Sequence, residues 1–115
     1  MTAEALSKVI VKGMEEKKAS DILVMDLRNI KNSVTDFFVI CSGNSDTQID
    51  AISKSIEEEV HKVGESPAWK VEGKSNGQWI LMDYVNVVAH IFLKEKREFY
   101  GLEELWGDAK TTRIR

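Results

Sequence analysis

The stretch FFVICSGNSDTQIDAISKSIEEEVHKV, residues 37–63, combines two elements that decide the fold. Phe37–Cys41 is apolar at every position, which favours a strand buried on both faces. A Ser-Gly-Asn triplet breaks this strand, and Ser45 followed by Gln48 is a capping-box pattern that starts a helix. Gly64 supplies the stop. The helix carries one apolar stripe, made of Ile49, Ile52, Ile56, Val60 and Val63.

Three elements are predicted on the N-terminal side of this stretch. The spacing of apolar residues predicts a helix over residues 3–18, with Thr2 as its cap. The run DILVMDL at residues 21–27 is rich in strand formers and predicts a strand. Residues 28–36 are polar and without a regular period, so we expect a loop.

On the C-terminal side, two strands are predicted at residues 69–73 and 78–84, joined by a turn at Asn76–Gly77. A nearly all-apolar strand follows at residues 87–93. The later predictions are a helix from Glu95 that ends at Gly107, and a mobile basic tail over about residues 109–115.

This order of elements predicts one domain over residues 1–115, of the α/β (α+β) class. Its core would be a mixed sheet of about five strands flanked by helices. The chain has 115 residues, of which 43% are hydrophobic and 30% charged. This composition excludes a disordered chain, and no apolar run approaches the roughly 18 residues of a membrane span.

The charge balance argues against general nucleic-acid binding. The chain has 16 basic and 19 acidic residues, a net charge of −3, and counterion release rewards clustered Lys and Arg instead. A single cysteine excludes an internal disulfide and a cysteine-built zinc site. Without a signal core or a transit pattern at the N-terminus, we expect a cytoplasmic protein.

Several residue types that carry chemistry are present without a supporting pattern. Cys41 could act as a nucleophile with His61 or His90 as its base, but its place at the end of an apolar strand favours a buried, inert thiol. We expect His61 to be exposed and His90 to be a core histidine. No metal site is predicted, because Asp21 and Asp26 lie five positions apart and face opposite sides of a regular strand.

The Ser42–Ser45 turn before the central helix could cradle a phosphate with its free backbone N–H groups. It lacks both glycine-rich phosphate-binding motifs, so a plain turn with a helix cap is the favoured interpretation. The late aromatic residues leave two alternatives open, core packing or use as interface anchors. For Phe92 and Phe99 we favour the core, whereas Trp79, Tyr84, Tyr100 and Trp106 could serve in either way.

Six ordered blocks carry a resemblance to a known family. They are DILVMDLR (21–28), TDFFVICSG (35–43), EG (72–73), GQWILMDY (77–84), VVAHIF (87–92) and REFYGLEELWGDA (97–109). In this order and spacing the chain closely resembles the ribosomal silencing factor family, also called the Iojap family. The resemblance covers roughly residues 5–110.

The resemblance implies a protein that is not an enzyme and needs no cofactor. Family members bind the fourteenth protein of the large ribosomal subunit and block subunit joining, which lowers translation in starvation or stationary phase. They are also linked to large-subunit biogenesis in organelles. The resemblance further implies a nucleotidyltransferase-like fold and a homodimer, and it fits a bacterial cytoplasmic location. The net charge of −3 indicates little direct RNA contact, because RNA phosphates would repel it.

On this basis we expect a partner-binding face on the C-terminal half. Its candidate residues are Trp79, Leu81, Asp83, Tyr84, His90, Phe99, Tyr100, Leu102 and Trp106. The acidic balance suits a basic ribosomal protein.

Two alternatives remain. One is a nucleotide-binding enzyme like the nucleotidyltransferases, which need an Asp-x-Asp pair after their Gly-Ser turn. Here only Asp46 and Asp50 follow Gly43–Ser45. The other is a homodimeric module with a non-ribosomal partner.

One turn departs from the family pattern. Where members usually have Asp-Tyr-Gly-Asp, this chain has Asp83–Tyr84–Val85–Asn86. Valine tolerates a positive φ poorly, so we expect the turn either to avoid positive φ at Val85 or to carry strain of about 1 kcal/mol or more. The loss of the second carboxylate puts any charge contact at Asn86 in doubt.

Overall fold

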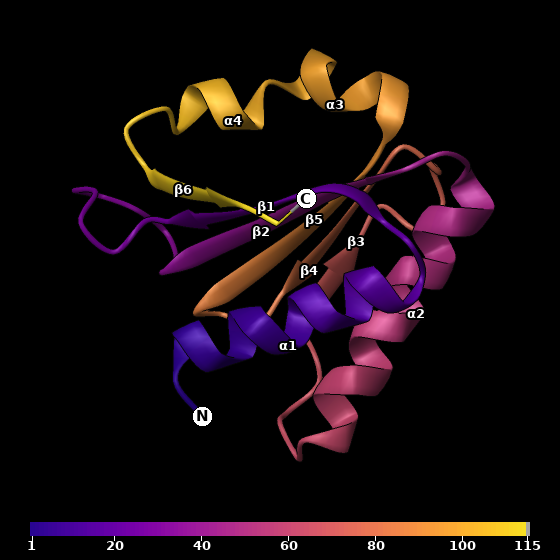
Figure 1. Ribbon diagram of the computed structural model, residues 1–115, viewed down its shortest axis with the longest axis horizontal. Coiled ribbons are helices and arrows are strands. Elements are labelled where there is room, and N and C mark those ends of the chain that lie inside the picture. Colours follow the sequence, from indigo (N-terminus) through magenta and orange to yellow (C-terminus); the bar gives the residue numbers. More distant parts are fainter. Residues whose placement is uncertain (115) are drawn as a thin grey trace.

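The computed structural model describes residues 1–114, apart from the side chain of Phe99. Within these residues a mixed sheet of six strands, in the order β3-β4-β5-β2-β1-β6, lies between two helical layers (Figure 1). The elements are α1 (Ala3–Glu16), β1 (Ser20–Asp26), β2 (Phe37–Gly43), α2 (Asp46–Lys62), β3 (Lys70–Glu72), β4 (Trp79–Asp83), β5 (Val87–Leu93), α3 (Lys94–Tyr100), α4 (Leu102–Leu105) and β6 (Lys110–Arg113). The predicted fold class is confirmed.

The two central strands explain the apolar runs in the sequence. β2 and β5 pair in parallel, with Phe37 opposite Val87 and Gly43 opposite Leu93. Every residue of β2 is buried, as its apolar sequence predicted. The other strand pairs are antiparallel. The chain leaves β2 toward one face of the sheet and β5 toward the other, so α2 and α3 lie on opposite sides (Figure 1).

The α1–α2 layer packs closely on one face. Gly13 of α1 makes this possible, because a Cβ atom there would lie 2.7 Å from the Cα atom of Ile56 in α2. The Ser55 hydroxyl donates a hydrogen bond of 2.8 Å to the carbonyl oxygen of Gly13 at the same crossing. The predicted caps also form, since the side chains of Thr2 and Ser45 accept hydrogen bonds at the starts of the two helices. No helix in the described part of the chain has the length and apolar character needed to cross a membrane.

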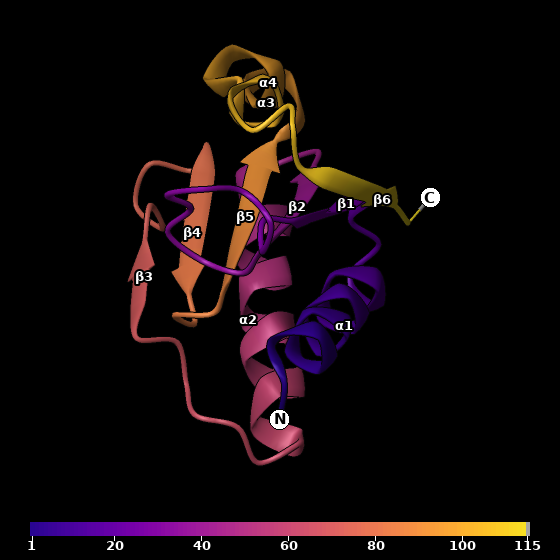
Figure 2. The same ribbon diagram turned by 90° about the vertical axis from the view of Figure 1, so that its left-hand side faces the viewer.

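The C-terminal region differs from prediction in two places. The segment expected as a tail instead supplies β6, which pairs with β1 from Leu23–Arg113 to Asp26–Lys110. The polar sequence gave no sign of a strand here. Every residue of this edge strand is exposed, so no alternation of apolar and polar residues marks it. The predicted single helix is also interrupted. Gly101 adopts a left-handed conformation with φ of 61° and separates α3 from α4. Figure 2 shows these two helices together beyond the C-terminal end of β5.

The backbone of the turn between β4 and β5 is strained at Val85, which is one of the two outcomes that the sequence predicted. Val85 has a φ of 74°, in the left-handed region that a β-branched residue rarely occupies. Two hydrogen bonds hold this conformation. The Val85 N–H donates to the Asp83 carboxylate at 2.7 Å, and the Thr35 hydroxyl donates to the Val85 carbonyl oxygen at 2.9 Å.

Candidate interaction site

The two faces of the sheet carry different side chains because strand residues alternate. On β4, Ile80 and Met82 enter the core beneath α1 and α2, which we call the helix-side core. Trp79 and Leu81 point to the other face. There a group of rings gathers from β2, β4, β5, α3 and the end of α4. We call it the aromatic cluster, made of Phe38, Trp79, His90, Phe92, Tyr100 and Trp106.

Trp79 lies at the centre of the aromatic cluster. Its ring stacks on Phe92 with centroids 5.0 Å apart, and Tyr100 lies 4.6 Å away in a tilted arrangement. The indole Nε1–H donates a hydrogen bond of 3.1 Å to Nδ1 of His90. Trp106 reaches the same group through an edge contact with Phe38, with centroids 5.8 Å apart. The indole of Trp79 is therefore held by rings and by a directional bond.

His90 is the buried polar member of the cluster, only 3% exposed. Burial lowers its pKa to about 3, so the imidazole is neutral near neutral pH. Because Nδ1 accepts from Trp79, we assign the proton of the neutral ring to Nε2. No described residue accepts a hydrogen bond from Nε2. The expected core histidine is thus hydrogen-bonded through one nitrogen, while His61 is exposed.

Several predicted site residues keep part of their surface in water. They are Trp79, Leu81, Asp83, Tyr100, Leu102 and Trp106, all half-buried. All but Asp83 belong to the aromatic cluster or pack beside it. Leu105, on the short helix α4, is 75% exposed next to them. A half-buried group of aromatic and aliphatic side chains is a common form of protein-docking surface.

One predicted residue, Tyr84, is not brought into this group. Tyr84 packs against the helix-side core, because the alternation along β4 places it on the same face as Ile80 and Met82. Its buried hydroxyl lacks a hydrogen-bond partner among the described residues, and burial raises its pKa to about 12, with Glu57 adding to the effect. The side chain of Phe99 lies outside the described residues.

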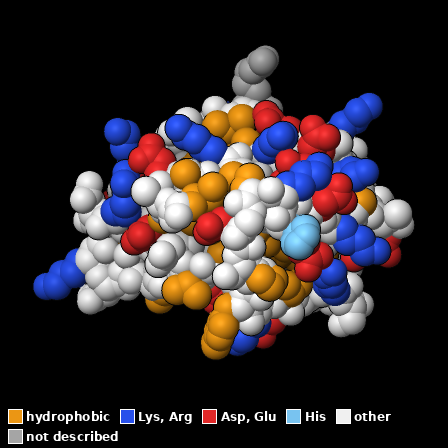
Figure 3. Space-filling model, turned by 90° about the horizontal axis from the view of Figure 1, so that it is seen from below, with side chains coloured by type: hydrophobic (Ala, Val, Ile, Leu, Met, Phe, Trp, Pro, Cys, Tyr) orange, Lys and Arg blue, Asp and Glu red, His pale blue; other side chains and the backbone are white. Residues whose placement is uncertain are grey.

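Val85 of the strained turn and Trp69, which precedes β3, belong to a second, smaller group of exposed apolar residues. Trp69 is 71% exposed and Val85 60%, and both line a hollow together with Leu6, Pro67 and Tyr84. Figure 3 views the molecule from below and shows hydrophobic side chains gathered among charged ones on that side. Trp69 was visible in the sequence, but nothing there indicated that it is more exposed than the other two tryptophans.

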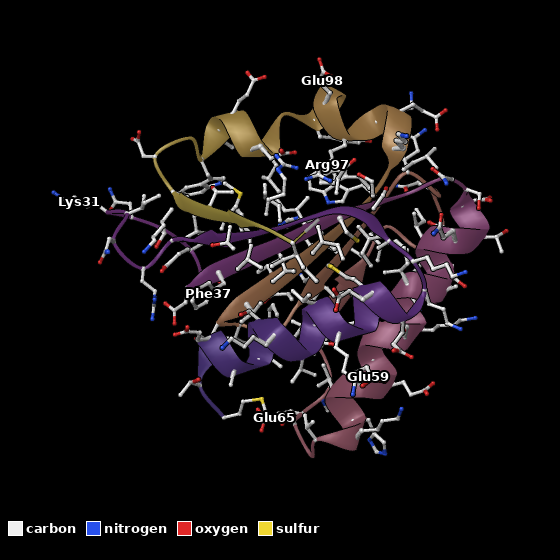
Figure 4. The ribbon with its side chains drawn as sticks, viewed as in Figure 1. Lys31, Phe37, Glu59, Glu65, Arg97 and Glu98 are labelled. Carbon is white, nitrogen blue, oxygen red and sulfur yellow. The ribbon has the colours of Figure 1, made fainter. Side chains whose placement is uncertain are left out.

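Arg97 is a site residue that sequence reasoning missed. Its guanidinium lies between α3 and the sheet (Figure 4). Nη1 donates to the carbonyl oxygen of Asp21 at 2.6 Å and to the hydroxyl of Ser42 at 2.9 Å, and Nε donates to Glu103 at 2.7 Å. Arg97 therefore ties α3 and α4 to the ends of β1 and β2, and so positions the helical side of the aromatic cluster. A lone arginine in a charged helix gave no signal for this role.

The Asn44 backbone N–H and the Ser45 hydroxyl of the Ser42–Ser45 turn are engaged in internal hydrogen bonds. The backbone N–H of Asn44 donates to Gln48 Oε1 at 2.6 Å, and the N–H of Gln48 donates to the Ser45 hydroxyl at 3.1 Å. This bonding favours the plain capped turn over a phosphate cradle. Cys41 is fully buried, and burial raises the pKa of its thiol, as the inert interpretation predicted. Among the described residues no group of three His, Cys, Asp or Glu side chains could hold a metal ion.

Comparison with known proteins places these features in a family. The family model described as "Ribosomal silencing factor during starvation" matches residues 1–115. The chain belongs to the ribosomal silencing factor family. The Bacillus subtilis ribosomal silencing factor is 39% identical over 109 residues, which cover 95% of this chain and 91% of the relative.

Two further matches extend this result. Mouse mitochondrial assembly of ribosomal large subunit protein 1 is 34% identical over 100 residues, which cover 85% of this chain and 43% of that longer protein. A crystal structure of protein CV0518 from Chromobacterium violaceum superposes with a TM-score of 0.87 at 28% identity. It covers all of this chain, and this chain covers 94% of it. The ribosomal silencing factor fold therefore extends over the whole chain.

Proposed function

We propose that this protein is a ribosomal silencing factor that binds the large ribosomal subunit through its fourteenth protein. Seated there, it would block association with the small subunit by its bulk and so repress translation under nutrient limitation or in stationary phase. The observation that carries this proposal is the half-buried aromatic cluster with Trp79 at its centre. Family membership supports it, since the matching family description names silencing of ribosomes during starvation.

The net charge and the apolar character of the proposed surface support a protein partner rather than RNA. The chain carries a net charge of −3, which favours encounter with a basic ribosomal protein and disfavours a footprint on phosphates. The docking surface we propose combines the partly exposed rings of the aromatic cluster, supported from beneath by its buried members, with Leu81, Asp83 and Leu102. Large apolar side chains would supply most of the affinity, as they do at the centres of protein interfaces. Direct contact with RNA would be small.

The proposal makes the protein a binding factor without an enzymatic activity of its own. It would act in the cytoplasm on large subunits, as a single domain and without a cofactor. Off the ribosome it would form a homodimer. A role in large-subunit biogenesis fits the name of the mouse relative, which refers to assembly of that subunit.

Sedimentation through a sucrose gradient with separated ribosomal subunits tests this function. We expect the protein to travel with the large subunit and to keep the two subunits apart at a Mg²⁺ concentration that otherwise joins them. A pull-down that recovers the fourteenth large-subunit protein would agree with it. The proposal fails if the protein stays at the top of the gradient, or if subunits join normally with the protein bound.

A further inference from the structure

The hydrogen-bonding groups of two aromatic residues in the cluster, Trp79 and Tyr100, are bonded to other side chains of the protein. Tryptophan and tyrosine commonly anchor interfaces through both a ring and a hydrogen-bonding group. In this chain the single N–H of the Trp79 side chain donates to His90 at 3.1 Å. The hydroxyl of Tyr100 donates to Gln78 Oε1, also at 3.1 Å. Both donors are thus engaged before any partner arrives.

The acceptor at Trp79 is well suited to hold a fixed geometry. His90 lies in β5 directly opposite Leu81 of β4 and is packed edge-on against Phe38, with centroids 4.7 Å apart. A ring packed in this way has little freedom to turn, so its Nδ1 lone pair points in one direction. The indole must align with that direction to keep its bond. Trp79 is therefore preorganised, which reduces the entropy lost on binding.

The surface that Trp79 and Tyr100 leave for a partner is the hydrocarbon of their exposed ring edges. The side chains of Leu81 and Leu102 flank it. Asp83, the charged residue among the predicted contacts, uses one carboxylate oxygen to accept a hydrogen bond from the N–H of Val85. A hydrogen-bond acceptor of the partner could not bond to the N–H of Trp79 or the O–H of Tyr100 without breaking an internal hydrogen bond. An apolar side chain has no hydrogen bond to satisfy and carries no such cost.

We propose that the aromatic cluster recognises an apolar side chain of its protein partner, with His90 as the positioning residue that fixes the Trp79 ring for this contact. This inference rests on the proposed function for the identity of the partner. It goes beyond that function by assigning the chemistry of the recognised group and the role of His90. The Trp79–His90 and Tyr100–Gln78 bonds stay within the protein when the complex forms.

Matched variants at His90 separate positioning from packing. Asn and Leu have nearly the same shape, but only Asn can place an acceptor where Nδ1 of histidine lies. His90→Asn should bind large subunits within about threefold of the wild-type protein, whereas His90→Leu should bind at least tenfold more weakly. Equal losses in the two variants, or full binding by His90→Leu, would overturn the role of His90.

Tyr100→Phe tests the chemistry of the recognised group. This variant removes only the hydroxyl, so we expect binding within about twofold of wild type. A tenfold loss would show that the partner uses the hydroxyl and would contradict apolar recognition. Because the change is small and the residue half-buried, this arm does not depend on the folding of the His90 variants.

An NMR measurement on the free protein tests the internal bond without a ribosome. The chain has three tryptophans, and the Trp79→Phe variant identifies which indole N–H signal belongs to Trp79. We expect this proton to exchange with water at least tenfold more slowly than that of Trp69, and to lose this protection in His90→Leu but not in His90→Asn. Equally rapid exchange in wild type would refute the positioning role. If protection is found but large subunits are not bound, the proposed function fails and the positioning of Trp79 stands.

Discussion

The two faces of the sheet are built from the same strands but differ in the type and the burial of their side chains. The helix-side core is almost wholly aliphatic, and Ile52, Ile56 and Met82 are completely buried there. The opposite face carries the aromatic cluster, in which Trp79 and Trp106 remain half-exposed beneath the short helices α3 and α4. Complete burial stabilises the first face, whereas the partly exposed rings of the second face belong to the docking surface that we propose.

The largest expected effect comes from truncating one residue on each face. Ile56→Ala should cost about 2–5 kcal/mol in the free energy of unfolding, because it leaves a cavity in the close-packed core. Leu81→Ala, on the half-buried face, should cost less than half as much but should weaken binding to large subunits. Urea denaturation and sedimentation measure the two quantities. Similar stability losses, with binding impaired only in Ile56→Ala, would break the distinction between the faces.

Gly13→Ala tests how tightly the helical layer is packed. The added Cβ would meet the backbone of Ile56 at 2.7 Å, so α1 and α2 must move apart. We expect a loss of about 2 kcal/mol, since overpacking costs more than the better helix propensity of alanine returns. Lys8→Ala, on the exposed side of the same helix, is the control and should change stability little. An unchanged urea midpoint for Gly13→Ala would show that the crossing is looser than described.

The aromatic face should add a loss of stability below neutral pH that the aliphatic side chains of the helix-side core do not produce. His90 stays neutral in the folded protein down to a pKa of about 3, but in the unfolded chain it takes up a proton near pH 6.5. Its contribution is therefore fully present above about pH 6.5 and is lost as the pH falls toward 3, by about 1.4 kcal/mol per pH unit. His90→Asn should show a shallower decline in stability between pH 6.5 and 4.5. Parallel curves for the two proteins would contradict this.

The smallest expected effect concerns the turn that joins β4 and β5. Val85→Gly should raise the free energy of unfolding by about 1 kcal/mol, because glycine accepts the φ of 74° without strain. Val87→Gly, two residues later in a fully buried position, should instead destabilise the protein. Thermal unfolding of the two variants measures both signs. A lower melting temperature for Val85→Gly would mean that the valine contributes packing that outweighs its backbone strain.

The regular part of this fold could be predicted from the sequence because its residues obey simple periods. The apolar run Phe37–Cys41 and the stripe from Ile49 to Val63 identified a buried strand and its helix, although Val63, at the C-cap, proves to be exposed. The exposed edge strand β6 could not be predicted in this way, since Thr111 and Thr112 show no alternation of burial. The break at Gly101 was hidden as well, because the apolar spacing continues through it.

The candidate site was predictable only in part. The residue types and the alternation of Trp79 and Leu81 were visible in the sequence, but which face they share depends on the tertiary fold. Tyr84 was grouped with them by proximity along the chain, whereas the alternation that buries Ile80 and Met82 places its ring against the helix-side core. The links made by Arg97 join residues up to 76 positions apart, which no local pattern reveals.

The rate of subunit joining, followed by light scattering, tests the central claim most directly. The claim is that the aromatic cluster docks on the large subunit, and two tryptophans in the same chain provide the comparison. Trp69→Ala removes a ring that is 71% exposed but lies away from the cluster, so it should inhibit joining as strongly as wild type. Trp79→Ala should require at least tenfold more protein for the same inhibition. Equal inhibition by the two variants, or a loss confined to Trp69→Ala, would contradict this account.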